Sequence, residues 1–135
     1  MKLKLITFFA VLVFVAGIVS LEHAHDDKTE KANIPFDFYA GAQKMSAGSY
    51  RIGIDLETDI ITFTDESGKQ RMYLMGTPGR EGGDTSQLVF NHLGDVYALQ
   101  ELQSDVIDLV FQTRVPGPAM AGRNASSQVE VALTR

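Results

Sequence analysis

Residues 88–99, with the sequence LVFNHLGDVYAL, constrain the fold most, because they predict a β-hairpin with the two-residue turn Gly94-Asp95. Glycine in the first position of such a loop suits a type II′ turn, whose twist matches that of the flanking strands. The turn predicts four cross-strand pairs: Leu93 with Val96, His92 with Tyr97, Phe90 with Leu99, and Leu88 with Glu101. Since side chains alternate between the faces of a strand, the expected core face carries Leu88, Phe90, Tyr97 and Leu99.

Residues 49–75 hold a second pattern, in which three alternating apolar segments are separated by two short turns. Turns at Glu57-Thr58 and Ser67-Gly68 align two apolar rows across the segments: Ile52–Phe63–Met72 and Ile54–Ile61–Leu74. Because two separate turns give one coherent apolar face, the pattern predicts a three-stranded antiparallel meander. Glu57-Thr58 is not a favoured two-residue turn, so a loop longer by an even number of residues is the alternative there.

The other segments are also typical of β-structure. Residues 34–39 alternate, with Pro35 at the strand start because proline lacks an amide donor. Residues 129–134 predict a closing strand, and the glycine-rich residues 76–86 a mobile loop. Residues 105–112 fit a strand or a helical turn, and their β-branched content favours a strand. The chain is therefore expected to be all-β: a small antiparallel meander forming a sandwich or barrel of seven to eight strands.

An export segment is predicted at the start of the chain. Lys2 and Lys4 precede a nearly unbroken apolar run at residues 5–19, which is the pattern of a secretory signal peptide. This gives a signal helix over residues 1–20, a flexible polar lead-in over 21–33, and one β domain over 34–135. The alternative is an uncleaved membrane anchor, for which the run is a little short. An exported protein, periplasmic or extracellular, is expected, with membrane contact only if this segment is not cleaved.

Composition excludes several kinds of chemistry. The 135-residue chain has no cysteine, so disulfides, thiolate metal sites and cysteine nucleophiles are absent. Its formal net charge is −5, and loss of Lys2 and Lys4 with residues 1–20 leaves 10 basic and 17 acidic residues, or −7. No stretch gathers the remaining lysines and arginines, so a nucleic-acid partner is not expected. The partner would instead be another protein or an envelope component.

Few side chains are candidates for a site, and no catalytic residue or cofactor is predicted. His23, His25 and Asp26 are weak metal candidates, because imidazole and carboxylate groups can share a cation. A solvated tail is the simpler interpretation, since nothing rigid would hold those ligands in place. His92 and Tyr97, paired on the predicted hairpin, are a possible ligand or surface site, although a polar cap at the strand end near the turn is the favoured interpretation.

Three motifs together resemble a group of short secreted β-rich proteins of unknown function from acidobacteria and other soil bacteria. The motifs are Ile-Pro-Phe-Asp-Phe from Ile34, Ala-Gly-Ser-Tyr from Ala47, and the hairpin 88–99. Members of the group carry Pro-Ala-Gly-x-Tyr and Leu-Val-Phe-x-Arg-Tyr-Gly-Asp-x-Tyr. This chain departs from that pattern with Ser46 in place of the proline and His92-Leu93 in place of Arg-Tyr. The resemblance implies export and a bacterial source, and it assigns no activity.

The sequence supports three hypotheses of function, in descending order. The first is an exported, non-enzymatic β-domain with a binding or structural role in the periplasm or cell envelope. The second is a carrier of a small apolar ligand in a barrel or inter-sheet cavity, suggested by many large apolar side chains that a packed core would also explain. The third is a hydrolase-type enzyme, which is disfavoured because no Gly-x-Ser-x-Gly or His-Glu-x-x-His motif is present.

Overall fold

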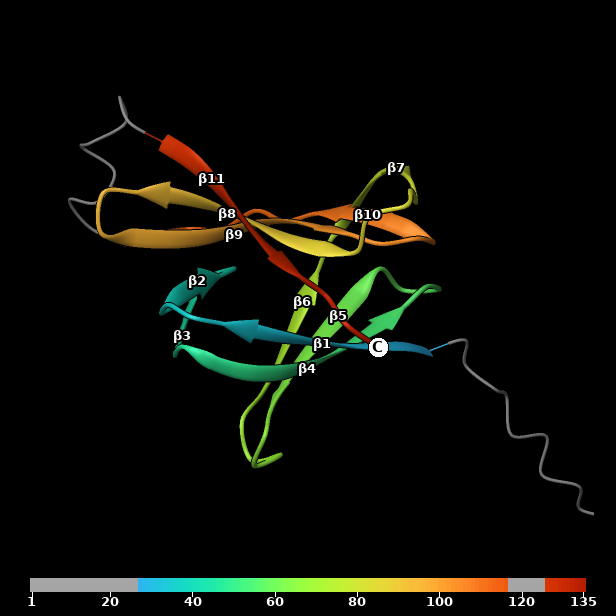
Figure 1. Ribbon diagram of the computed structural model, residues 1–135, viewed down its shortest axis with the longest axis horizontal. Coiled ribbons are helices and arrows are strands. Elements are labelled where there is room, and N and C mark those ends of the chain that lie inside the picture. The colour runs from blue at the N-terminus through green and yellow to red at the C-terminus, as the bar shows by residue number, and fades with distance from the viewer. Residues whose placement is uncertain (1–26, 117–125) are drawn as a thin grey trace, which may run out of the picture.

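The computed structural model describes residues 27–116 and 126–135, and every regular element in these ranges is a β-strand (Figure 1). Eleven strands are described, where seven or eight were predicted. The expected signal segment, residues 1–20, lies outside the described residues. Within the described ranges there is no helix long and apolar enough to cross a membrane. The all-β class predicted from the sequence is confirmed.

The strands form two sheets. The first contains β1 (Asp27–Ile34), β4 (Gly48–Asp55), β5 (Ile60–Asp65) and β6 (Arg71–Met75), in that spatial order. The second contains, in spatial order, β11 (Ser126–Ala132), β8 (Gln87–Leu93), β9 (Val96–Gln103), β10 (Ile107–Val110) and β7 (Thr77–Glu81). A short hairpin of β2 (Phe38–Ala40) and β3 (Gln43–Met45) joins the second sheet, where β2 pairs with β9.

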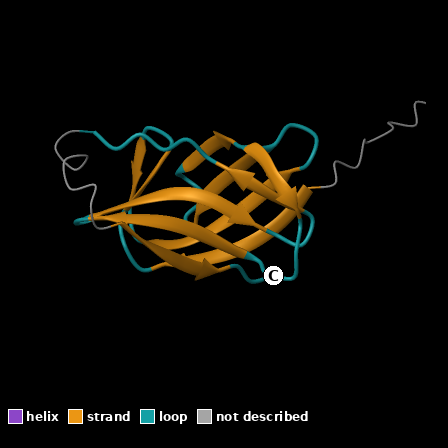
Figure 2. Ribbon diagram, turned by 90° about the horizontal axis from the view of Figure 1, so that it is seen from above, coloured by secondary structure: helices purple, strands orange, loops and turns teal. Residues whose placement is uncertain are grey.

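The two sheets lie face to face and are open (Figures 1 and 2). At one place the chain crosses directly between them at Gly76, the residue between β6 and β7. At another, the segment after β11 reaches β1, where Lys31 and Thr134 form an isolated antiparallel bridge. Neither sheet closes on itself within the described part of the chain, so the barrel alternative is wrong.

The meander predicted over residues 49–75 is confirmed with its register. Ile52 lies opposite Phe63, which lies opposite Met72, and the Ile54–Ile61–Leu74 row is also present. The first loop is longer than two residues, because the β4–β5 pairing ends at Asp55 and Ile60. That four-residue loop keeps the register of a two-residue one, as expected for an extension by an even number. Asp55 organises it by accepting the backbone N–H groups of Glu57 and Thr58 at Oδ1.

The hairpin predicted over residues 88–99 is also confirmed, with one correction. Gly94 has φ of 61°, and Asp95 is not among the residues with positive φ, as a type II′ turn requires. The pairs nearest the turn are those predicted, down to Phe90 with Leu99. Beyond them the register shifts by one, so Leu88 pairs with Leu102 and not with Glu101. The extra residue is Gln100, and the resulting bulge places two fully buried leucines together.

The predicted flexible lead-in is wrong from residue 27 onward, because residues 27–34 form β1 and pair with β4 over their whole length. The inward positions of β1 are Lys28, Glu30, Ala32 and Ile34, of which Glu30 is only 1% exposed. Two of these four positions carry charges, so the apolar alternation that marks a strand is hidden in the sequence. The backbone hydrogen bonds to β4, together with Ala32 and Ile34 in the core, explain why the segment is ordered.

Two further segments differ from the prediction. Residues 34–39 are not one strand, because β1 ends at Ile34 and β2 begins at Phe38. Pro35 follows β1 directly, where its missing amide donor cannot continue the ladder. The glycine-rich segment 76–86 contains β7, which pairs with β10. All five β7 side chains are exposed, so the sequence of β7 lacks the apolar alternation that predicts a strand. Pro78 is tolerated because β7 lies at a sheet edge.

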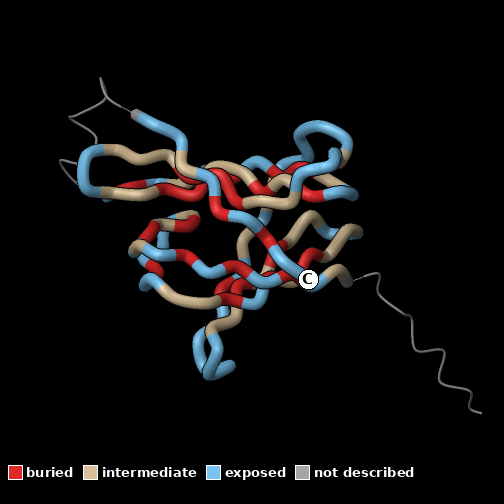
Figure 3. The backbone as a smooth tube through the Cα atoms, viewed as in Figure 1, coloured by how far each residue is buried: buried red, intermediate tan, exposed pale blue. Residues whose placement is uncertain are grey.

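The core lies between the two sheets, where the buried stretches gather (Figure 3). Its largest fully buried side chains are Phe38, Phe63, Phe90, Ile34, Met45, Ile52, Ile54, Ile61, Leu88, Leu99, Leu102 and Leu109. Phe38 links the sheets, with its ring centroid 5.3 Å from that of Phe90 and 5.8 Å from that of Tyr50. The large apolar residues that suggested a ligand cavity are thus mostly engaged in packing, and no observation favours the carrier hypothesis.

Candidate functional site

The strand register of the first sheet assembles a row of cations on its outer face. Lys31 lies opposite Arg51, which lies opposite Thr64, which lies opposite Arg71. All three cationic side chains are exposed, and none forms an ion pair within the described residues. Adjacent strands lie about 4.8 Å apart, so the row crosses the sheet over roughly 15 Å. We call Lys31, Arg51 and Arg71 the cationic row.

The neighbouring row on the same face is neutral and polar. It consists of Thr29, Gly53, Thr62 and Tyr73, one residue from each strand. Gly53 has no side chain, and a hollow of about 340 Å³ lies there, lined by Thr29, Thr62 and Tyr73 and, at one end, by Asp55. The Tyr73 ring is 66% exposed. An exposed ring beside threonine hydroxyls can contact a ligand by both stacking and hydrogen bonding.

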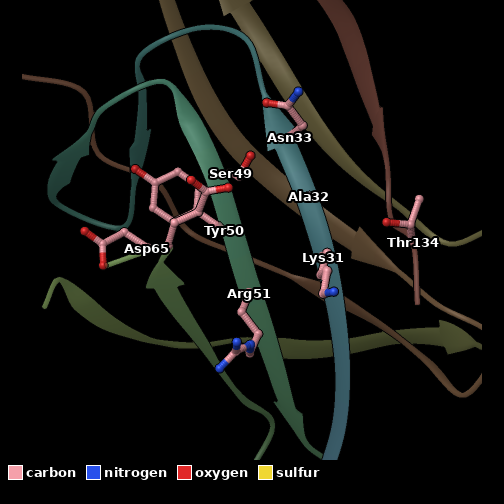
Figure 4. Close-up of a pocket in the computed structure, with 9 residues that line it drawn as sticks. Lys31, Ala32, Asn33, Ser49, Tyr50, Arg51, Asp65 and Thr134 are labelled. Atoms are coloured by element: carbon pink, nitrogen blue, oxygen red, sulfur yellow. The ribbon is translucent and has the colours of Figure 1, made fainter. Parts of the chain in front are cut away.

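A second hollow, of about 410 Å³, lies on the other side of the cationic row (Figure 4). Its lining comes from β1, β4, the end of β5 and the segment after β11: Lys31, Ala32, Asn33, Ser49, Tyr50, Arg51, Asp65, Glu66 and Thr134. Lys31 and Arg51 stand on neighbouring strands at one end of this hollow, and Asp65 lies beside the Tyr50 ring (Figure 4). The hollow therefore combines cations, carboxylates and neutral hydrogen-bonding groups.

Tyr50 forms part of the wall of this hollow and is held in place by its hydroxyl. The hydroxyl donates to the backbone oxygen of Ser46 at 2.6 Å. Burial raises the pKa of Tyr50 above its usual value, and the negative charges of Asp65 and Asp37 raise it further. Asp37 is itself fixed, because its Oδ1 accepts the backbone N–H of Ala47 at 2.8 Å. Tyr50 is therefore a neutral, positioned group at neutral pH.

Asp65 is kept charged by the β5–β6 turn. Its Oδ1 accepts the Gln70 backbone N–H at 3.1 Å, and its Oδ2 accepts the Ser67 hydroxyl at 2.9 Å. These hydrogen bonds, that to Gln70 first, lower the pKa of Asp65. The carboxylate thus both shapes the turn and places a fixed negative charge at the edge of the hollow.

The predicted pair His92 and Tyr97 is formed, and it is a stack of rings. Their ring centroids are 4.2 Å apart with the planes inclined by 3°, and Tyr97 also stacks on Phe36 at 3.8 Å. Phe36 in turn packs edge-on against Phe90 of the core. His92 forms no hydrogen bond or ion pair with any described residue. The pair therefore has a packing role at the end of the hairpin.

The metal candidates His23, His25 and Asp26 lie outside the described residues. Among the residues that are described, no group of three or more His, Asp or Glu side chains is placed to hold a metal ion.

A charged cluster joins the two sheets on the inward side of β1, the side that faces away from the cationic row. Lys28 forms ion pairs with Glu30, at 2.8 Å, and with Asp105 of the β9–β10 loop. Asp105 also pairs with Arg135 at 2.9 Å, and the Ser86 hydroxyl donates to Glu30 Oε1 at 3.3 Å. Glu30 Oε2 is buried with no hydrogen-bond partner among the described residues. We interpret this cluster as a structural seam, because its members tie β1 to the loops of the second sheet.

The cationic row was not predicted from the sequence, in which no single stretch gathers lysines and arginines. The three cations lie about twenty residues apart and meet only through the sheet register. The alternation of the predicted meander did place Arg51 and Arg71 on its outward face. Lys31 could not be added, because its strand was not predicted.

In the comparisons with known proteins, no family model, curated protein or solved structure matches this chain.

Proposed function

We propose that this chain is an exported, non-enzymatic binding domain of the bacterial cell envelope, and that the outer face of its first sheet binds an anionic polysaccharide. The observation that carries the proposal is the cationic row, in which three exposed cations lack an acidic partner among the described residues. The chain as a whole is acidic, with a formal net charge of −5. A concentration of unpaired positive charge on one face of an acidic protein is what an anionic ligand requires.

The groups around the row favour a polysaccharide over a nucleic acid. Asp65 and Glu66 border the hollow next to Lys31 and Arg51. Such carboxylates accept hydrogen bonds from sugar hydroxyls, whereas they repel the closely spaced phosphates of a nucleic acid, about one charge per 1.7 Å in duplex DNA. A polymer with one carboxylate per sugar unit has a lower charge density. Three cations spread over the width of a sheet match that density better.

The non-enzymatic part of the proposal is supported by the surroundings of the described histidine. His92 is stacked on Tyr97, and no described carboxylate or hydroxyl forms a hydrogen bond with it. A general base needs a partner that orients its ring and a nucleophile within hydrogen-bond reach. The hydrolase hypothesis therefore gains no support from this residue.

Polygalacturonate, a carboxylate polysaccharide, is the probe that tests the proposal. The purified chain should bind it in isothermal titration calorimetry, with an affinity that falls as salt rises. The double variant Arg51→Ala/Arg71→Ala should bind roughly tenfold or more weakly, because it loses two of the three cations. The matched control Lys44→Ala/Arg80→Ala removes the same charge from exposed positions on β3 and β7, and should bind as the wild type does.

Three results would overturn the proposal. The first is no binding of polygalacturonate at low salt. The second is an equal loss of affinity in the two double variants, which would mean that binding depends on net charge and not on the cationic row. The third is tighter binding to a DNA duplex than to polygalacturonate, which would replace the polysaccharide with a nucleic acid as the partner. Neutral dextran serves as the reference for sugar binding without charge.

A further inference from the structure

The strand β6 is the least protected of the five edge strands that are described, and the edge strand β3 is only three residues long, with the sequence QKM. The edge strand β1 is bridged by Thr134, and β7 carries Pro78 and charged side chains that discourage pairing. The edge strand β11 is polar, with the sequence SSQVEVA. In contrast, β6 reads RMYLM, with no proline and no inward charge, and pairs with β5 alone. Its Tyr73 and Met75 side chains, 66% and 70% exposed, are the most exposed large apolar groups of the described chain.

The hydrogen bonds of β6 show which backbone groups face this open edge. The Gly76 N–H donates to the Asp59 carbonyl and the Gln70 carbonyl accepts from Asp65, so both residues point towards β5 and the loops at its ends. In an antiparallel ladder the direction alternates along the strand. Arg71, Tyr73 and Met75 therefore direct their N–H and C=O groups outward, where no described residue bonds to them.

We propose that two copies of this chain form a dimer by antiparallel pairing of their β6 strands, with the two Tyr73 residues opposite each other on the two-fold axis. This register uses the free backbone groups of all three outward-pointing residues in each copy. Tyr73 exchanges two hydrogen bonds with Tyr73 of the second copy, and Arg71 exchanges two with Met75 of the second copy, on either side of the axis. It rests on the sheet edge alone and does not depend on polysaccharide binding.

The side chains of β6 are compatible with this self-pairing. Met72 and Leu74 lie on the inner face and face each other across the axis, because the strand pattern is symmetric about Tyr73. On the outer face each Arg71 lies opposite a methionine and diagonally beside a tyrosine ring, so no like charges meet. Cross-strand aromatic pairs and arginine–ring contacts are both favourable. A second copy therefore fits this edge without a charge conflict.

The dimer would contain one continuous eight-stranded sheet. Paired residues project to the same side of a sheet, so the outer faces of both copies lie on one side. Each copy then contributes its own cationic row to a single surface, and the two exposed tyrosines meet at its centre.

Multi-angle light scattering after size exclusion tests the proposal, using the chain purified from the periplasm of an expression host without polysaccharide. The wild type should have twice the monomer mass and dissociate on dilution. Tyr73→Lys and Tyr73→Glu should each be monomeric, because like charges would meet on the axis. An equimolar mixture of these two variants should regain the dimer mass. Arg80→Glu, on the edge strand β7, should remain dimeric as the matched control.

A wild type that stays monomeric at every concentration overturns the proposal. So does a dimer that persists in both charge variants, or a mixture that stays monomeric while circular dichroism shows both variants folded. If a charge variant fails to fold, Tyr73→Pro provides the test instead. It removes only an N–H that points away from β5, so its fold should be kept and its dimer lost. A folded, dimeric Tyr73→Pro variant contradicts the pairing.

Discussion

Leu88 lies opposite Leu102, because a bulge at Gln100 shifts the register of the β8–β9 hairpin by one residue. Both side chains are fully buried. Leu88→Ala should lower the free energy of unfolding by about 2–5 kcal/mol, since it removes packed methyl groups and leaves a cavity. Urea denaturation measures this loss, with Val110→Ala, at an exposed position, as the control expected within about 0.5 kcal/mol of wild type. Equal losses at the two positions would contradict the burial of Leu88 in the core.

The turn at Gly94 should be sensitive to any side chain that restricts its backbone. Its φ is 61°, and an added Cβ would meet nothing within 4 Å. Gly94→Val should therefore destabilise the domain by about 1–3 kcal/mol through backbone strain alone. His92→Gln, which removes only a stacked ring, should cost less than about 1 kcal/mol. Thermal denaturation of both variants checks the order, and a reversed order would refute this account of the hairpin.

The Lys31–Thr134 bridge should contribute measurably to stability. Lys31 N–H donates to the Thr134 carbonyl at 2.7 Å, and Thr134 N–H donates to the Lys31 carbonyl at 2.9 Å. Thr134→Pro removes one of these donors and should cost about 1–2 kcal/mol in a urea denaturation curve. Arg135→Ala, which removes an exposed ion pair with Asp105, is the neighbouring control and should cost at most about 1 kcal/mol.

The buried Glu30 should make its cation partner indispensable. Lys28→Met leaves a carboxylate that is 1% exposed without its ion-pair partner, so we expect a loss of about 3–5 kcal/mol. The double variant Lys28→Met/Glu30→Met removes both charges and should be more stable than the single variant Lys28→Met. A double-mutant cycle by urea denaturation measures the coupling. Additive losses would mean that the two charges do not interact.

Acid should weaken the β5–β6 turn through Asp65. Hydrogen bonds from Gln70 and Ser67 lower the pKa of this carboxyl in the folded state. Its contribution to stability is therefore complete above the unfolded-state pKa and is lost as pH falls through the lower folded-state pKa. Asp65→Asn should show a shallower fall of the melting temperature with acidification than the wild type. Glu66→Gln, on the exposed part of the same turn, is the control that should keep the wild-type slope.

The parts of the fold that could be predicted are those in which apolar periodicity and turn chemistry agree. The β4–β5–β6 register followed from alternating isoleucines and two turns, and the β8–β9 turn followed from Gly94. The bulge was visible only as the three-residue spacing of Leu99 and Leu102, since two inward residues of a regular strand are an even number apart. The hairpins could therefore be predicted from local sequence patterns.

The missed parts depend on contacts between distant residues. The strand β1 was hidden because Lys28 and Glu30 occupy inward positions, and their burial depends on Asp105 and Ser86 elsewhere in the chain. The strand β7 was not predicted, because its side chains are all exposed and it is held to β10 by backbone pairing. The cationic row depended on β1, so it could not be predicted before that strand was known.

The bridge between Lys31 and Thr134 also sets an order of events during folding. Its two residues are separated by about a hundred positions, whereas the β4–β5 and β8–β9 hairpins need only neighbouring segments. Synthesis proceeds from the N-terminus, so local hairpins can form before Thr134 is available to pair with Lys31. Contacts at such long separation slow folding. The contact that joins the end of the chain to β1 therefore forms late, after the local hairpins.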